Sequence, residues 1–175
     1  KTSPLLKGVH TWHMVDKNGY FGRHENDKEP PMWPHDGSVR SKTSAAYQHM
    51  IHKYLRAVGA VDDNIKRVID YLEKERIKAD TLIIYTSDQG YWLGQHGLYD
   101  KRLILEGSLK MPFIVRYPKE IKAGTVNEAL CSNVDFAPTL LGVVSVPVPK
   151  AMQGVSLRPL LRGKKPANWR QGIWY

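Results

Sequence analysis

The chain has 175 residues, of which 42% are hydrophobic and 25% are charged, and this balance is typical of a folded globular domain rather than a disordered or fibrous chain. The formal net charge is +9, but Lys and Arg alternate with acidic residues along the whole chain and no nucleic-acid-binding motif occurs, which argues against a nucleic-acid-binding module. No stretch approaches the roughly eighteen apolar residues that a membrane span needs.

Residues 1–42 are rich in glycine, proline and polar side chains, and their apolar residues follow no period. Gly and Pro interrupt helices and strands, and so long an irregular stretch is usually a functional loop or an extension packed on a larger body. We therefore expect an irregular leader over residues 1–42. Because the chain starts at Lys1 without an initiator Met, we also expect it to be cut from a longer protein.

A long helix is predicted from Ser44 to about Ile77. Ser44 is a suitable N-cap, and charged side chains on the opposite face indicate a helix that lies on a sheet with one side in water. Apolar residues recur at intervals of three and four, which places them on one helix face, at Tyr47, Met50 or Ile51, Tyr54, Val58, Val61, Ile65, Val68 and Leu72.

Two strands are predicted after this helix. Residues 81–86 form a short, nearly all-apolar run of β-favouring residues, which indicates a strand covered on both faces. A second run at residues 113–117 ends at Pro118, and proline cannot continue a strand ladder. A helix followed by a buried strand is the repeating unit of an α/β fold, so we expect that fold class.

Two further helices are predicted near the C-terminus. Asp135 is suited to cap a helix that ends at Gly142, and a short helix is expected over residues 157–161. We expect residues 43–163 to form an α/β domain, and residues 164–175 to begin a separate C-terminal segment.

Asp88 and Gln89 stand at the exit of the first predicted strand, where open α/β sheets collect their ligands. A carboxylate beside an amide carbonyl provides the hard oxygen donors that calcium prefers, and Gly90 allows the chain to turn away. A glycine-rich loop then reaches two cations, Lys101 and Arg102, thirteen and fourteen residues after Asp88. This spacing predicts a positive charge beside a metal-bound anion.

The full set of motifs resembles the sulfatase family of the alkaline phosphatase superfamily, over about Tyr47 to Arg162. Within that family, the residues of these motifs look most similar to those of glycan-desulfating enzymes that act on 6-sulfated N-acetylglucosamine or related glycosaminoglycan sugars. The resemblance is carried by Tyr54-Leu55-Arg56, Val61-Asp62-Asp63-Asn64, Thr86-Ser87-Asp88-Gln89-Gly90, Leu93-Gly94-Gln95-His96-Gly97, Asp100-Lys101-Arg102, Glu106, Ser108-Leu109, Met111-Pro112, Asn133-Val134-Asp135-Phe136-Ala137-Pro138-Thr139 and Gln153-Gly154-Val155-Ser156-Leu157.

The resemblance implies the later portion of an alkaline-phosphatase-like mixed sheet flanked by helices, with residues 43–163 as part of a sulfatase domain packed on the remainder of that fold. It implies that Asp88 and Gln89 bind Ca²⁺ and that Lys101 holds the sulfate oxygens of a sulfated saccharide. His96 either contacts substrate or the ligand shell, or only orders the loop. Arg102 is a further substrate-binding candidate, or pairs with Asp100. The family location would be periplasmic, secreted or lysosomal, and the sequence leaves the compartment open.

The family nucleophile is a formylglycine made from Cys or Ser in a Cys/Ser-x-Pro/Ala-x-Arg motif. Neither Cys131 nor Ser145 has the required following residues, so we expect the nucleophile outside this chain and the chain alone to be inactive. Cys131 is instead expected to be a small buried apolar residue.

Two alternatives to a sulfatase stay open. A phosphonate or phosphodiester hydrolase of the same superfamily is one, although such enzymes tend to have Asp-His at the metal pair, where this chain has Gln89. A noncatalytic module that keeps the scaffold is the other.

Overall fold

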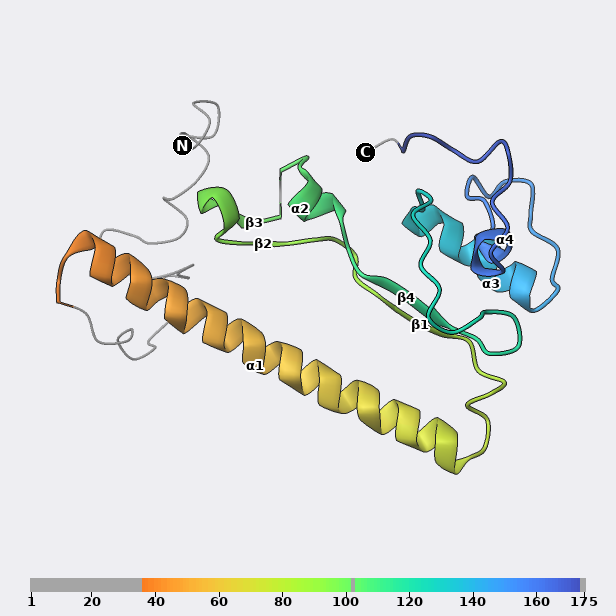
Figure 1. Ribbon diagram of the computed structural model, residues 1–175, viewed down its shortest axis with the longest axis horizontal. Helices are drawn as coiled ribbons and strands as arrows, with labels where there is room; N and C mark the ends of the chain where they lie inside the picture. The colour runs from red at the N-terminus through yellow and green to blue at the C-terminus, as the bar shows by residue number, and fades with distance from the viewer. Residues whose placement is uncertain (1–35, 102, 174–175) are drawn as a thin grey trace. The chain divides into compact units, whose positions relative to one another are not determined.

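The computed structural model describes residues 36–101 and 103–173 (Figure 1). Helices and short strands both occur, as expected for an α/β chain, whereas residues 1–35 of the predicted leader lie outside the described residues. The elements, with η for a 3-10 helix, are α1 (Val39–Lys74), β1 (Ile83–Thr86), β2 (Trp92–Leu93), η2 (Gln95–Gly97), β3 (Tyr99–Asp100), α2 (Glu106–Leu109), β4 (Phe113–Arg116), η3 (Asn133–Asp135), α3 (Phe136–Val143) and α4 (Arg158–Leu161).

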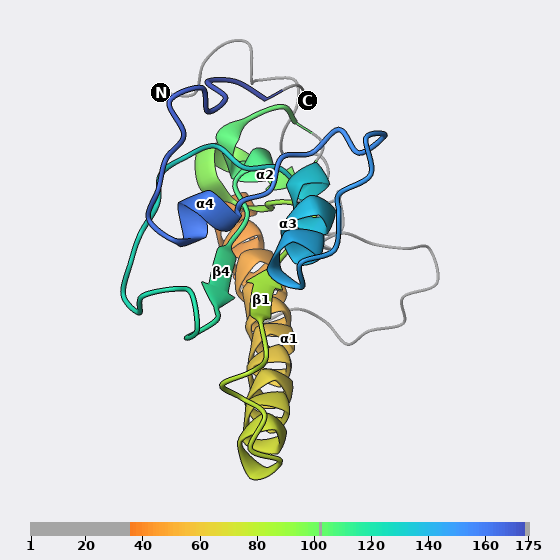
Figure 2. The same cartoon turned by 90° about the vertical axis from the view of Figure 1, so that its right-hand side faces the viewer.

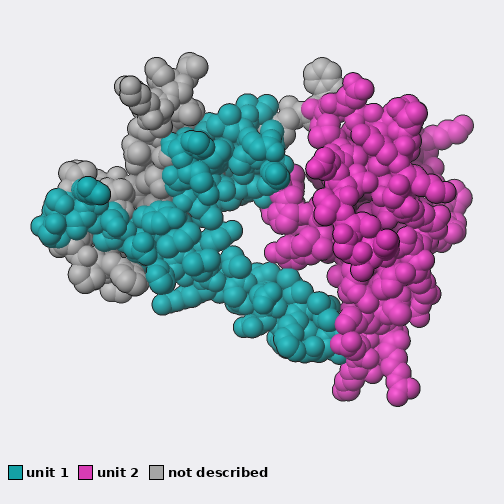
Figure 3. Space-filling view, viewed as in Figure 1, with its two compact units in different colours: residues 1–70, 89–110 teal, residues 71–88, 111–175 magenta. Residues whose placement is uncertain are grey.

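The chain divides into two compact units (Figure 3). The first unit comprises residues 1–70 and 89–110, and it holds most of α1 together with β2, η2, β3 and α2. The second unit comprises residues 71–88 and 111–175, with β1, β4, α3 and α4. This division differs from the three segments expected from the sequence, whose boundaries at residues 42 and 163 stay predictions.

The long helix predicted by the apolar spacing is confirmed as α1, but it begins earlier than expected. The backbone N–H of Ser41 donates to the hydroxyl of Ser38 at 3.2 Å, which is the bond that an N-cap residue accepts from the third helical position. Ser38 therefore caps the helix, and the predicted N-cap Ser44 lies inside it. Neither α1 nor any other helix within the described residues has an apolar stretch long enough to cross a bilayer.

The apolar stripe of α1 is covered only in part. Ala45 and Met50 are buried, whereas Val61 and Val68 are 49% and 58% exposed. Apolar side chains at helical spacing usually face a packed neighbour. These two positions of the stripe are therefore exposed in the described part of the chain.

β1 and β4 form an antiparallel pair that lies side by side in Figure 2. Both predicted strands are present and slightly shorter than expected. The prediction that the first is covered on both faces is wrong for the described residues, because Tyr85 is 41% exposed. Its cross-strand partner Ile114 is 62% exposed. Partners directly opposite share a face of the ribbon, so this pair is exposed on one face, whereas Ile83 and Arg116 on the same face are half-buried.

The second unit has a small hydrophobic core centred on Leu157, Leu160 and Trp169. The indole Nε1 of Trp169 donates to the carbonyl of Leu130 at 2.9 Å, so its one polar group is satisfied. α4 confirms the short helix predicted at this place. Partly buried residues that pack against the core are Phe113, Ala129, Cys131, Phe136 and Leu161.

Cys131 is half-buried in this core, and burial raises the pKa of its thiol above the ordinary value. The neighbouring carboxylate of Asp135 raises the same pKa further. A thiol that stays protonated is a weak nucleophile. Cys131 is therefore a packing residue, as predicted.

Asp135 is completely buried just before α3. Its carboxylate accepts hydrogen bonds from the backbone N–H groups of Ser132 and Val155, both at 2.8 Å, and from Arg170 at 2.6 Å. The predicted role as N-cap of α3 is therefore wrong for the side chain, which makes no cap bond to that helix. Asp135 instead joins three separate segments, because a buried carboxylate needs several donors to offset its lost hydration.

Candidate functional site

The predicted metal ligands Asp88 and Gln89 follow the end of β1 after one residue, Ser87. The Asp88 side chain is exposed and accepts a hydrogen bond from the Ser87 hydroxyl at 3.2 Å, and Gln89 is half-buried. A carboxylate and an amide oxygen are a donor set that suits calcium. In residues 36–101 and 103–173 no three His, Cys, Asp or Glu side chains gather in a way that could hold a metal. The calcium assignment stays a prediction.

Gly90 is required by a close backbone approach, which the sequence did not indicate. Its N–H donates to the carbonyl of Ser108 at 2.8 Å. A β-carbon at position 90 would lie 2.1 Å from the carbonyl oxygen of Gly107 and 2.9 Å from that of Lys110. Only glycine lets the chain after the predicted metal pair run this close to α2.

The glycine-rich loop is a small, internally bonded hairpin. Trp92 of β2 lies opposite Asp100 of β3, and the Gly94 N–H donates to the Leu98 carbonyl at 2.8 Å. Gly94 has a φ of 108°, which a residue with a β-carbon rarely adopts. Leu98 is only 2% exposed and anchors the hairpin. The sequence had indicated a loop here, without its strands or its anchor.

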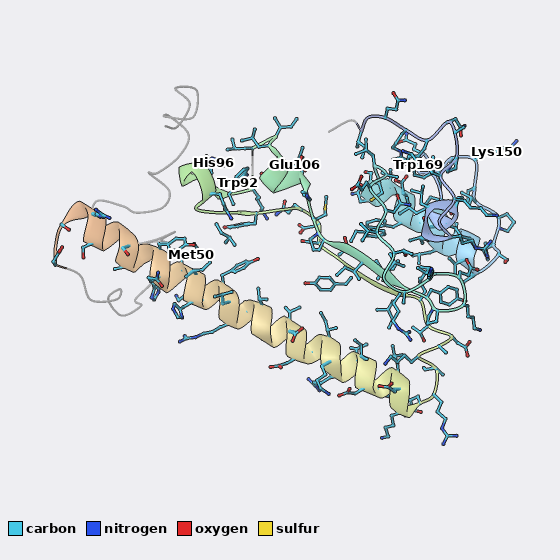
Figure 4. The ribbon with its side chains drawn as sticks, in the orientation of Figure 1. Met50, Trp92, His96, Glu106, Lys150 and Trp169 are labelled. Carbon is cyan, nitrogen blue, oxygen red and sulfur yellow. The ribbon has the colours of Figure 1, made fainter. Side chains whose placement is uncertain are left out.

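His96 lies at the tip of this hairpin, in η2. Its side chain is exposed, and its φ of 56° is uncommon for a residue other than glycine. The imidazole packs edge-on against the indole of Trp92, with the ring centroids 5.9 Å apart and the planes at 70° (Figure 4). The structure thus shows His96 as part of the loop's packing, and its contact with substrate stays a prediction.

Lys101 directly follows β3, and its side chain is exposed. The hairpin therefore brings Lys101 and His96 into the same short element of the first unit. Arg102 lies outside the described residues, so its predicted substrate contact and its predicted ion pair with Asp100 stay untested.

Sequence reasoning missed the two side chains that attach this hairpin to α2. The Trp92 Nε1 donates to the Ser108 hydroxyl at 2.9 Å, and Ser108 is 2% exposed. Trp92 stood out only as an aromatic residue among glycines, and Ser108 only as part of a family motif. Their pairing spans sixteen residues, and no periodic pattern indicates such a contact.

Comparison with known proteins places the chain in a family. Residues 94–175 match the family model described as N-sulphoglucosamine sulphohydrolase, C-terminal. An N-acetylglucosamine-6-O-sulfatase of Bacteroides thetaiotaomicron is 49% identical over 143 residues, which are 79% of this chain and 26% of that protein. This relative and the family model agree with the resemblance that the motifs indicated.

Two solved structures extend the match to the fold. One, a complex with its substrate D-glucosamine-2-N,6-O-disulfate, has a TM-score of 0.74 and 49% identity over 77% of this chain and 28% of its own. A phosphonate monoester hydrolase from Silicibacter pomeroyi has a TM-score of 0.68 and 36% identity over 78% of this chain and 26% of its own. The chain thus spans about a quarter of the length of the proteins it matches. It has the predicted alkaline-phosphatase-like α/β fold, belongs to the sulfatase family and matches the C-terminal part of that family.

Proposed function

We propose that the protein to which this chain contributes hydrolyses a sulfate ester on a glucosamine-type sugar, and that this chain supplies part of the sulfate-binding site. The observation that carries the proposal is the 49% identity to an N-acetylglucosamine-6-O-sulfatase. A structure with the same identity holds a disulfated glucosamine substrate. The net charge of +9 suits such an anion, since a cationic protein attracts an anionic substrate over long range.

The proposed roles follow from the chemistry of sulfate transfer. As the S–O ester bond breaks, negative charge shifts to the bridging oxygen, which leaves. Fixed positive charges around the sulfate group stabilise the charge that develops in the transition state. The ammonium group of Lys101 would bind the nonbridging sulfate oxygens as a point charge. Asp88 and Gln89 would hold a calcium ion, which supplies Lewis-acid stabilisation of the same oxygens. A formylglycine nucleophile would come from a part of the complete protein outside this chain.

Removal of Lys101 is the sharpest test of these roles. In the complete protein we expect Lys101→Ala to lower kcat for release of sulfate from glucosamine 6-sulfate about 100- to 1000-fold, as loss of a single oxyanion-stabilising group does. Lys150→Ala is a matched control, because Lys150 is an exposed lysine of the second unit (Figure 4). Sulfate is measured by ion chromatography. Equal effects of the two substitutions would refute the assignment.

The calcium proposal has a separate measurement. Asp88→Asn keeps the shape of the side chain and removes its charge, so we expect calcium to bind the complete protein at least about tenfold more weakly, since loss of even an outer-shell partner of a metal ligand typically costs about 10- to 100-fold. Asp62→Asn is the control, since Asp62 is an exposed carboxylate within α1. Isothermal titration with Ca²⁺ measures both, and unchanged binding in Asp88→Asn would remove this residue from the metal site.

A phosphonate monoester hydrolase is the second candidate, because one such enzyme shares 36% identity and the fold. The two activities differ in the group that is transferred. We therefore expect sulfate release from the sulfated sugar to exceed hydrolysis of phenyl phosphonate esters by the same protein. The reverse order would favour the second candidate.

A further inference from the structure

Trp92 makes three different contacts in the first unit. Its indole Nε1 donates to the hydroxyl of Ser108 at 2.9 Å, and its ring meets the imidazole of His96 in a T-shaped contact with 5.9 Å between centroids. The ring also covers Gly107, where a β-carbon would lie 2.5 Å from two atoms of the indole. One side chain thus connects α2 with the tip of the hairpin (Figure 4).

These contacts leave the indole a single arrangement. Ser108 is 2% exposed, so its hydroxyl has little access to water and the hydrogen bond from Trp92 satisfies it. The absence of a side chain at Gly107 creates the space that the ring occupies. Gly90 reinforces the arrangement, because its N–H bonds the carbonyl of the same Ser108. The indole is therefore fixed by both its polar group and its face.

The position of the Trp92 ring affects His96 and Lys101, the two residues of this region that are predicted for the sulfate site. His96 has a left-handed backbone conformation, which positions its imidazole at the tip, and the T-shaped contact with the indole of Trp92 orients that ring. Trp92 also lies opposite Asp100 in the β2–β3 ladder, and Lys101 follows that residue directly. A displaced indole would move both the imidazole and the start of the Lys101 segment.

We infer that Trp92, held by Ser108, is a positioning residue that sets the orientation of His96 and the placement of Lys101. Its effect on turnover rests on the proposed function, whereas its effect on the His96 ring does not. Sub-ångström to ångström displacements of groups around a reacting centre lower rates strongly. Trp92 would thus act on kcat through its neighbours without touching the sulfate.

Nuclear magnetic resonance on the complete protein tests the contact without relying on turnover, and Ser108→Ala, which keeps the ring current of the indole, then tests the positioning. We expect Trp92→Leu, which removes the ring, to shift the His96 ring-proton resonances, and Trp92→Phe to restore most of the wild-type shift. Trp169→Phe is a matched control: it also removes a hydrogen-bonded indole, in the second unit, and should leave His96 unchanged. Unchanged His96 resonances in Trp92→Leu would overturn the inference.

Ser108→Ala keeps the indole of Trp92 and removes only the hydroxyl that accepts its hydrogen bond. This variant therefore tests the inference even if Trp92→Leu does not fold. We expect it to shift both the indole N–H resonance of Trp92 and the ring protons of His96. A shift of the indole resonance without any response of His96 would contradict the inference.

Turnover of the complete protein supplies the second measurement. We expect Trp92→Leu to lower kcat for sulfate release about 10- to 100-fold while KM changes little. The kcat of Trp92→Phe should lie between those of the wild type and Trp92→Leu. A His96 shift without any loss of kcat would overturn the effect on catalysis and keep the orientation of the ring. A wild-type protein without sulfatase activity would refute the proposed function, and the resonance measurement would still decide the role of Trp92.

Discussion

The hairpin region of the first unit and the Asp135 region of the second unit both consist largely of irregular chain, but different interactions hold them in place. Around residues 90–110, glycines allow backbones to meet, and the chemically interesting side chains His96 and Lys101 remain exposed. Around Asp135, charged groups are buried and fully paired. The hairpin therefore leaves these two side chains accessible, as the proposed sulfate site requires, while the second region stabilises the fold.

The buried pairing of the second unit extends beyond Asp135. The hydroxyl of Thr139 donates to the Asp135 carbonyl at 2.6 Å and accepts from the Leu157 N–H at 2.7 Å. Gly154 packs so closely that a β-carbon there would lie 1.8 Å from the carbonyl oxygen of Val134. Among the described residues, no buried side-chain N or O atom lacks a hydrogen-bond partner. Such a network is expected to fail when one member is removed.

Asp135→Ala should have the largest effect on stability. It leaves the Arg170 guanidinium and two backbone N–H groups without their acceptor, and loss of one partner of a buried ion pair typically costs about 3–5 kcal/mol. Urea unfolding followed through the indole N–H resonance of Trp169 measures the second unit. The exposed Asp62→Ala should stay within about 0.5 kcal/mol of wild type. A comparable loss in both variants would contradict the comparison.

The Glu120 carboxylate should have the next largest effect, and it should depend on pH. Hydrogen bonds from Arg158 and Arg162 lower the pKa of Glu120 to about 2 from the ordinary value of 4.5. Because the folded pKa is depressed, the stabilisation is fully present above about pH 4.5 and is lost as pH falls toward 2. Glu120→Gln should cost about 1.5–3 kcal/mol near neutral pH, as for hydrogen bonds to charged groups.

Urea unfolding of wild type and Glu120→Gln across pH 2 to 7 checks this prediction. The difference between the two proteins should stay constant above about pH 4.5 and shrink steadily below it. A difference that does not change with pH would show that Glu120 acts by packing and not by charge.

Gly59→Ala should have the smallest effect, with the opposite sign. Gly59 is an exposed residue inside α1, and a β-carbon there meets nothing within 4 Å, so alanine should stabilise the helix by about 0.5–1 kcal/mol. Gly124 has the same open surroundings but a φ of 73°, and Gly124→Ala should be destabilising. Hydrogen exchange of α1 amides and urea unfolding measure these two variants. If both variants were more stable than the wild type, open space around the glycine, and not its backbone conformation, would decide whether alanine stabilises the protein.

Local patterns were sufficient for the regular elements. The three- and four-residue spacing located α1, and the apolar runs located β1 and β4, because both signals depend only on neighbouring residues. The start of α1 was misplaced because Ser38 and Ser44 are equally good caps by composition. The exposure of Tyr85 and Ile114 on the β1–β4 ribbon was also missed, since composition alone does not tell what covers a strand.

The sequence by itself determined the family, the long helix, the strands β1 and β4, though not their pairing, and the residues proposed for calcium and sulfate. Only the tertiary structure decided why Gly90 and Gly107 must be glycines, which side chain faces His96, and that the Asp135 side chain joins distant segments and makes no cap bond to α3. Propensity and periodicity act over a few residues. Close approaches and buried hydrogen bonds join positions sixteen to thirty-five residues apart, and they exist only once the chain has packed.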